Sequence, residues 1–296
     1  MSNSINIKFW GVRGSTPCAN SENMHYGGNT TCVQIEVSGL DELLIFDCGT
    51  GFRNLGNSLI NSNEHLRGRI FITHPHWDHL QGFPFFKPFY EAQSWFRIYM
   101  PPQGDIGCSE ILQGHMSNTF FPVSMDMLEA DLDCETFQLG KKLFDGFTVE
   151  YMWASHTVPT AIYKISVGNK SIIFAPDNEL MEDRGDATEK FEKEFRSFIK
   201  DADLLIHDAQ FSREEYQNKI GWGHSAWEDV VDIAAEENVK RLLLTHHDPD
   251  NDDDKLSDIE AVMHSYANSN FEEISLAKEG QTVSLPLTKA DKVSVK

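Results

Sequence analysis

The stretch THPHWDHLQG, residues 73–82, places three histidines and one aspartate within six positions, directly after a short apolar run. His74 and His76 alternate by two, so on an extended segment their side chains point the same way. Asp78 and His79 follow where the chain turns toward a helix. Imidazole and carboxylate are good ligands for zinc, manganese or iron. Four such groups exceed what one ion comfortably uses from one loop, so the stretch predicts two metal ions.

Four other apolar runs of the chain also end on histidine or aspartate. These residues are His156, Asp177, the pair 207–208 (His-Asp) and the pair 246–247 (His-His). Binding and catalytic side chains commonly lie in the loops that follow the strands of a rigid scaffold. One strand ending in histidine is compatible with a simple hydrogen-bonding role. Four together, beside the loop described above, favour further metal ligands.

The elements that must position these residues are short strands separated by turns and helices. Apolar and β-branched runs predict strands at 5–10, 31–37, 43–47, 69–73, 144–153, 161–167, 170–175, 202–207 and 241–245, the last closing the fold. Helices are expected at about 51–60, 191–200 and 225–237, the third with Ser225 as N-cap and Glu228 completing a capping box. Hairpins come first, strands then alternate with helices, and the series repeats. This order predicts the α/β class, as an αββα sandwich of two mixed β-sheets with outer helices.

Residues 1–296 are expected to form a single domain, because the chain shows no linker, low-complexity tract or internal repeat. The stretch at about 83–142 is less regular, with five prolines among many aromatics, and is expected to form an elaborated lobe. The aromatics Trp77, Phe83, Phe85, Phe86, Phe120, Phe121 and Trp222 fit either core packing, which we favour, or stacking on a base. His115 lies in this lobe and is a candidate to roof the site.

The net charge is strongly acidic, with 25 Lys and Arg against 46 Asp and Glu, or −21 at pH 7. Such a surface repels polyanions unless charge is segregated, and no Lys/Arg cluster suited to them is present. We therefore expect a small substrate and no long nucleic acid as partner. The acidic run 248–254 is expected to be a solvated loop rather than a calcium site.

The cysteines and the apolar runs bear on the compartment. The five cysteines have no paired spacing, so core packing is expected rather than a disulfide framework. The N-terminus lacks a signal-peptide pattern, and no stretch approaches ~18 consecutive apolar residues. A cytoplasmic location without membrane contact is expected.

The HxHxDH order followed by His, Asp and His at strand ends resembles the metallo-β-lactamase-fold hydrolases, from residues 8–15 to about 285. Within that superfamily the chain looks most like the phosphodiesterase branch. This branch includes tRNase Z, the phosphoribosyl cyclic phosphate phosphodiesterase and cyclic-nucleotide phosphodiesterases, among them phage anti-Pycsar-type enzymes. Asp47 in FDCGTG and the triplet 223–225 (Gly-His-Ser) are features shared with the branch.

The resemblance implies a dinuclear centre of seven ligands, holding Zn²⁺ as the default and Mn²⁺ as a competitor. The first metal would be held by His74, His76 and His156, the second by Asp78, His79 and His246, with Asp177 bridging both. Asp47, His207 and His247 would support or pack against these ligands. Dimers are common in the branch, so a homodimer is an expected possibility.

The resemblance also implies how a phosphodiester would be cleaved. Two ions a few ångströms apart bind one hydroxide between them and neutralise phosphate oxygens. Asp78 would accept the water proton or orient the nucleophile. His224 would protonate the leaving oxygen, with Asp208 orienting its ring.

The function expected first is hydrolysis of a small cyclic nucleotide, with a 3′,5′-cyclic mononucleotide as the leading substrate. A tRNase Z-like endoribonuclease shares the same metal ligands and is the alternative within the branch. A metal-binding sensor that has lost catalysis is an alternative of another class. Hydrolysis of β-lactams, thioesters or lactones is disfavoured, because lactamase-like relatives often carry cysteine where this chain has Asp177.

Overall fold

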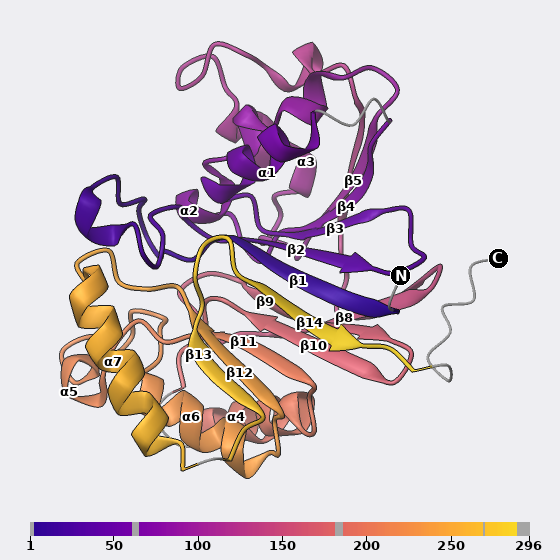
Figure 1. The fold of residues 1–296 in the computed structure, drawn as a ribbon. Helices are drawn as coiled ribbons and strands as arrows, with labels where there is room; N and C mark the ends of the chain where they lie inside the picture. The colour runs from indigo at the N-terminus through magenta and orange to yellow at the C-terminus, as the bar shows by residue number, and fades with distance from the viewer. Residues whose placement is uncertain (1–2, 61–64, 181–185, 269, 289–296) are drawn as a thin grey trace.

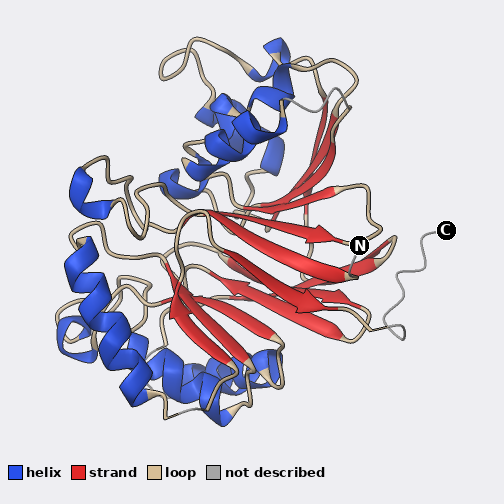
Figure 2. Ribbon diagram, viewed as in Figure 1, coloured by secondary structure: helices blue, strands red, loops and turns tan. Residues whose placement is uncertain are grey.

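Two seven-stranded sheets pack face to face, and the helices cover their outer faces (Figures 1 and 2). The computed structural model describes residues 3–60, 65–180, 186–268 and 270–288. Both sheets combine parallel and antiparallel pairs. The expected αββα sandwich of two mixed sheets is confirmed.

The first sheet has the strand order β14-β1-β2-β3-β4-β5-β6. Its strands are β1 (Ser4–Gly11), β2 (Cys32–Val37), β3 (Leu43–Phe46), β4 (Arg67–Phe71), β5 (Trp95–Met100), β6 (Asp131–Thr136) and β14 (Thr282–Pro286). The helical segments along this part of the chain are η1 (Ser21–Asn23), α1 (Gly51–Leu59), α2 (Trp77–Leu80), η2 (Phe83–Phe85), η3 (Lys87–Tyr90), α3 (Cys108–His115) and η4 (Met125–Met127). The stretch 83–142 thus supplies strands to the first sheet as well as the helices above it (Figure 1).

The second sheet has the order β13-β12-β11-β10-β9-β8-β7. Its strands are β7 (Gly140–Phe144), β8 (Phe147–Trp153), β9 (Ala161–Val167), β10 (Lys170–Ala175), β11 (Leu204–Asp208), β12 (Arg241–Thr245) and β13 (Glu273–Leu276). The helices of this half are α4 (Asp186–Ile199), α5 (Arg213–Tyr216), α6 (Trp227–Glu236) and α7 (Asp253–Tyr266). Strands β10 to β13 run parallel, so their carboxyl ends meet at one edge.

The core between the sheets fixes where these strands end. Phe46 on the first sheet packs against Phe174 on the second, with ring centroids 5.6 Å apart, and stacks on Phe71 at 5.2 Å. All three rings are buried. Because the two strand sets interlock through close-packed rings, the loops at the strand ends are held in fixed relative positions.

Helix α6 begins differently from the sequence prediction. Its N-cap is Ala226, which makes no side-chain cap, and no capping box forms with Glu228. The Ser225 hydroxyl instead donates to the carbonyl of Asn178 at 2.6 Å and accepts from the Leu180 amide at 2.9 Å. The prediction of Ser225 as N-cap is wrong, because tertiary partners on the loop after β10 take up the hydroxyl.

The prediction that 241–245 closes the fold is also wrong, since α7, β13 and β14 follow it. Strand β14 pairs with β1, placing Val283 opposite Ile7. The acidic run 248–254 is a solvated loop only in part. Asp252 caps α7 by accepting from the Lys255 amide at 2.8 Å, and Asp253 accepts from the amides of residues 25 and 26.

The cysteines divide into two groups. Cys32 and Cys48 are buried and free, as core packing predicts. Cys108 and Cys134 form a disulfide between α3 and β6, with their Cα atoms 5.8 Å apart, so the expectation of no disulfide is wrong for this pair. Their separation of 26 residues carries no signal, because only the packing of α3 beside β6 brings them together.

Candidate metal centre

Seven His and Asp side chains predicted from the sequence meet at one edge of the sandwich. Each follows a strand: the 74–79 group follows β4, His156 follows β8, Asp177 follows β10 and His246 follows β12. All are buried from solvent except His76 and His156, which are partly buried. The ligand atoms fall into groups whose members lie within 4.8 Å of one another.

The first group contains three histidines and one aspartate oxygen. His74 Nε2 lies 2.7 Å from His76 Nδ1, and His156 Nε2 lies 3.3 Å from that same Nδ1. The Oδ2 atom of Asp177 is 3.7 Å from His74 Nε2 and 3.6 Å from His156 Nε2. Three ring nitrogens and one oxygen therefore converge on one point.

The second group uses the other oxygen of Asp177. Its Oδ1 atom lies 3.0 Å from His79 Nε2 and 3.3 Å from His246 Nε2. The Oδ2 atom of Asp78 lies 3.2 Å from His79 Nε2 and 3.1 Å from His246 Nε2. Asp177 thus presents one oxygen to each group.

These residues fit divalent metal ions. Two ligand atoms on one tetrahedral zinc, each about 2.1 Å from the ion, lie roughly 3.4 Å apart, close to the separations above. His79 Nε2 and Asp177 Oδ1 are buried and make no hydrogen bond. Such atoms are rarely left unpaired, because burial without a partner costs free energy. Imidazole and carboxylate donors suit zinc, manganese and iron.

Charges within the cluster shift the pKa values of its members in opposite directions. Burial opposes ionisation of Asp177, but the facing histidines outweigh it and hold the pKa of its carboxyl well below the usual range. Burial likewise disfavours the His79 cation, yet Asp177, Asp78 and Asp47 raise its pKa well above normal. Burial and the neighbouring His79 lower the pKa of His74. A metal ion therefore competes with a proton at His79, because the acidic neighbours stabilise a bound metal ion and a protonated ring alike.

Asp47 orients the ring of His79. Its Oδ2 accepts from His79 Nδ1 at 2.8 Å, and its Oδ1 accepts from the Thr73 amide at 2.7 Å. The first contact fixes the tautomer that leaves His79 Nε2 free to bind a metal. Asp47 adopts the left-handed region with φ 61°, directly after β3. The expected supporting role agrees with this geometry.

The loop after β1 also contacts the cluster, which sequence reasoning missed. The Ser15 amide donates to Asp78 Oδ2 at 2.9 Å. Gly14 lies against His246: a Cβ at this glycine would come within 2.2 Å of the ring Nδ1. The signal available in the sequence was the Gly14-Ser15 pair, which belongs to the segment that carries the family resemblance.

His224 and Asp208 lie together beside the metal ligands. Asp208 Oδ2 is 3.3 Å from His224 Nδ1 and also accepts from the Asn178 amide at 2.7 Å. Its Oδ1 accepts from the Ser225 amide at 2.8 Å. The His224 ring stacks on that of His246 with centroids 4.7 Å apart. This pair is placed to act on a group bound at the cluster.

Glu179 was not predicted, and it holds the loop that carries His224. Its buried carboxylate accepts from the Gly221 amide at 2.7 Å, the Gly223 amide at 2.9 Å and the Tyr216 hydroxyl at 2.7 Å. The Gly223 carbonyl in turn accepts from His156 Nδ1 at 2.9 Å. One carboxylate therefore anchors both the His224 loop and the orientation of a candidate metal ligand.

The remaining predicted residues support the backbone, pack in the core, lie exposed or line a pocket. His207 Nδ1 donates to its neighbour's carbonyl at 2.7 Å, and His247 Nε2 donates to the Ala277 carbonyl at 2.8 Å, so both support the backbone. Phe83 and Phe86 are buried in the core, whereas Trp77, Phe85, Phe120 and Trp222 are exposed. His115 lies at a pocket beside α2.

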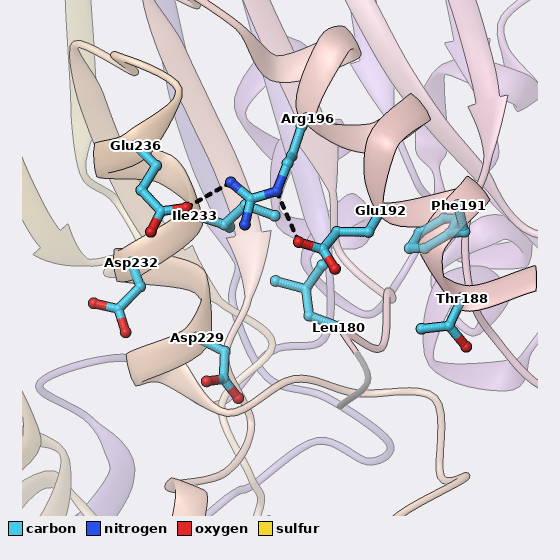
Figure 3. A pocket seen from close by; sticks show the side chains of 9 residues that line it. All are labelled: Leu180, Thr188, Phe191, Glu192, Arg196, Asp229, Asp232, Ile233 and Glu236. Atoms are coloured by element: carbon cyan, nitrogen blue, oxygen red, sulfur yellow. Dashed lines mark hydrogen bonds and ion pairs between the residues drawn. The ribbon is translucent and has the colours of Figure 1, made fainter. Parts of the chain in front are cut away.

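A different pocket lies between α4 and α6 (Figure 3). Arg196 crosses it and pairs with Glu192 at 2.7 Å and Glu236 at 2.6 Å. Asp229 and Asp232 lie along its other side, and none of the seven predicted ligands reaches it.

A sandwich of two mixed sheets with a His/Asp cluster at its strand ends defines the metallo-β-lactamase-fold hydrolases, a class of metal-dependent enzymes. The chain belongs to this class: residues 43–247 match the beta-lactamase superfamily domain. The resemblance to this superfamily and the prediction of a metal-dependent hydrolase are thereby confirmed.

The chain is also similar to relatives of known name. Ribonuclease Z of Archaeoglobus fulgidus is 26% identical over 294 residues, covering 81% of this chain and 86% of the relative. Ribonuclease Z of Oceanobacillus iheyensis is 23% identical, covering 70% and 79%. Among solved structures, the short form of human tRNase Z superposes with a TM-score of 0.66 at 20% identity, covering 95% of this chain and all of that one. The metallo-beta-lactamase fold protein YhfI of Bacillus subtilis superposes with a TM-score of 0.68 at 20% identity, covering 96% of this chain and 100% of that one.

These relatives correct the expectation that no long nucleic acid is a partner. Enzymes named ribonuclease Z, which act on RNA, match over most of this chain. The charge argument fails because a net charge averages the whole surface, whereas a phosphate at the active site meets the local field.

In the part of the chain that the structure describes, no helix has the length and apolar character needed to span a membrane.

Proposed function

We propose that the protein is a dinuclear metal-dependent phosphodiesterase acting on a nucleotide. The observation that carries the proposal is Asp177, whose two oxygens each contact a separate group of histidines. The first ion would be held by His74, His76, His156 and Asp177, and the second by Asp78, His79, His246 and Asp177. Zn²⁺ is the leading metal and Mn²⁺ the competitor. When bound, such ions lower the pKa of a water toward neutrality and neutralise phosphate oxygens.

The protein's own side chains then orient the water and move protons. Asp78, which accepts from the Ser15 amide, orients the attacking water or takes its proton. His224 has Nδ1 beside Asp208, which leaves Nε2 as the nitrogen that can protonate the departing oxygen. Asp208 holds the ring in this tautomer, as the carboxylate partner of a catalytic histidine does in other hydrolases.

Two substrate classes are supported by different observations. A 3′,5′-cyclic nucleotide is supported by the resemblance of the sequence to the phosphodiesterase branch, which includes cyclic-nucleotide phosphodiesterases. An RNA is supported by the relatives named ribonuclease Z. Both substrates present a phosphodiester to the same cluster, so the proposed chemistry is common to them.

The test is hydrolysis by purified protein loaded with Zn²⁺ or Mn²⁺. The substrates are bis(p-nitrophenyl) phosphate, cyclic mono- and dinucleotides, and a precursor tRNA. Asp177→Asn is expected to abolish turnover on every substrate, whereas Asp126→Asn, at an exposed position, leaves it unchanged. If metal-loaded protein cleaves no phosphodiester, the proposal is wrong and the non-catalytic sensor takes its place.

A further inference from the structure

A pocket with a cavity volume of about 540 Å³ is lined in part by residues of the metal-binding loop, among them Pro75 and Trp77. One wall comes from the metal-binding loop and α2, where Trp77 stands between His76 and Asp78. The opposite wall comes from the end of α3 and the turn after it, with His115, Phe120 and Phe121. Part of the pocket wall is therefore formed by the same loop that carries candidate metal ligands.

Aromatic side chains around this pocket are left exposed. Trp77 has 74% of its surface accessible, Phe120 81% and Phe85 48%. Phe85 meets Phe121 edge-on, with ring centroids 5.3 Å apart. Leaving such large apolar surface in water forgoes the free energy of burial, and clustered exposed aromatics commonly mark a binding site. Their flat faces suit a planar ring.

Among the described residues that line this pocket, one buried side-chain atom lacks a hydrogen-bond partner. Gln81 Oε1 is buried and makes no hydrogen bond, although Gln81 lines the pocket. Its carbonyl oxygen is an acceptor, so the missing partner is an N–H or O–H donor. Apolar walls with a few placed polar groups are the usual composition of a small-ligand pocket.

We propose that this pocket binds the nucleobase of the substrate, stacked against the exposed aromatics. The Gln81 amide, whose Oε1 is shielded from solvent in this structure, would turn toward the pocket and accept from an N–H group of the base. The inference rests on the proposed function, because it assumes a nucleotide whose phosphate lies at the metal centre. A nucleobase offers both kinds of partner that this pocket lacks. Its flat ring can stack on the exposed aromatics, and its ring or amino N–H groups can donate to the unpaired acceptor. Stacking of one base on an aromatic side chain strengthens binding by about 5- to 150-fold in other nucleic-acid-binding proteins.

The test compares two probes on metal-loaded protein, adenosine 5′-monophosphate and ribose 5-phosphate, which lacks the base. We expect the parent to bind the nucleotide more tightly by calorimetry. Phe120→Ala and Phe85→Ala are expected to weaken nucleotide binding about 10-fold or more and to leave ribose 5-phosphate unchanged. Leu143→Ala is the matched control, because Leu143 is 78% exposed on β7, outside the pocket lining.

The outcomes separate this proposal from the proposed function. Equal binding of both probes by a parent that hydrolyses phosphodiesters overturns the base pocket and leaves the phosphodiesterase standing. Variants that change self-association but not nucleotide affinity also overturn it and identify the aromatics as a contact between copies of the chain. A parent that cleaves no phosphodiester yet binds the nucleotide through Phe120 keeps the base pocket and rejects the enzyme.

Discussion

The Oδ1 atom of Asp177 lies 3.0 Å from Nε2 of His79, and both atoms are buried without a hydrogen-bond partner. A carboxylate that contacts two histidine groups through different oxygens has the geometry of a bridging ligand. Asparagine keeps the size of this side chain but offers only one oxygen. Asp177→Asn is therefore expected to lower metal content from about two ions per chain, measured by elemental analysis.

The same substitution should lower thermal stability. Ligands that bind only the folded state stabilise it by mass action, by about 4 kcal/mol at a thousandfold excess over Kd. A chelator is expected to lower the Tm of the parent and to affect Asp177→Asn much less. His65→Ala, at an exposed position, is the control and should match the parent. Active parent protein that contains one ion or none would refute the dinuclear centre.

His224 is predicted to act as the proton donor to the leaving oxygen. Its ring contacts Asp208 and stacks on His246, yet it is not among the seven expected ligands. His224→Ala should keep both metals and lower turnover on a nucleotide by about 10²–10⁴-fold. The loss should shrink on bis(p-nitrophenyl) phosphate, because the departing phenolate hardly needs a proton. Equal losses on the two substrates would remove His224 from the mechanism.

His247 is predicted to make the fold sensitive to acid. It is buried and donates to the Ala277 carbonyl, and burial lowers its pKa to about 4 from 6.5. Between these values the unfolded chain binds a proton that the folded chain does not. Its contribution to stability is therefore present above pH 6.5 and is lost as the pH falls toward 4, by about 3 kcal/mol at most.

His247→Gln tests this contribution, because the glutamine amide can donate to the same carbonyl without titrating. We expect the variant to lose less unfolding free energy than the parent between pH 7.5 and 5, measured by urea denaturation with chelator present. Parallel losses in both proteins would assign the acid sensitivity to other groups.

The meeting of the seven His and Asp side chains was predictable because its signals are local. The spacing of His74, His76, Asp78 and His79 lies within one loop, and each distant partner ends an apolar run that reads as a strand. Sheet packing then brings parallel strand ends to one edge. The fold class followed from the same periodicity, since alternation of strands and helices leaves few architectures that bury both faces.

Features that depend on tertiary contacts were not predictable. Ser225 matches a capping box in sequence, but Asn178 and Leu180 take up its hydroxyl. Cys108 and Cys134 pair only because α3 packs beside β6. Glu179 had no motif around it, because its role depends on the Gly221–Gly223 loop folding back over β10, about forty residues later in the chain.

Glu179 is predicted to be a positioning residue for both the metal centre and His224. Its two oxygens accept three hydrogen bonds, from the Gly221 and Gly223 amides and the Tyr216 hydroxyl. Glutamine would place an NH₂ group against one of these donors, which breaks that bond and frees the loop. Because a displacement of about 1 Å in a catalytic group can cost about 10²-fold in rate, Glu179→Gln should lower turnover on nucleotides by this order.

A readout beyond activity separates positioning from general destabilisation. If Glu179 acts through Gly223, the variant should lose metal from the group that contains His156, whose Nδ1 donates to the Gly223 carbonyl. It should also lose more activity on a nucleotide than on bis(p-nitrophenyl) phosphate, because His224 moves with the loop. Glu214→Gln, at an exposed position on α5, is the matched control and should change neither quantity. Equal losses on both substrates with full metal content and a lower Tm would show that Glu179 only stabilises the fold.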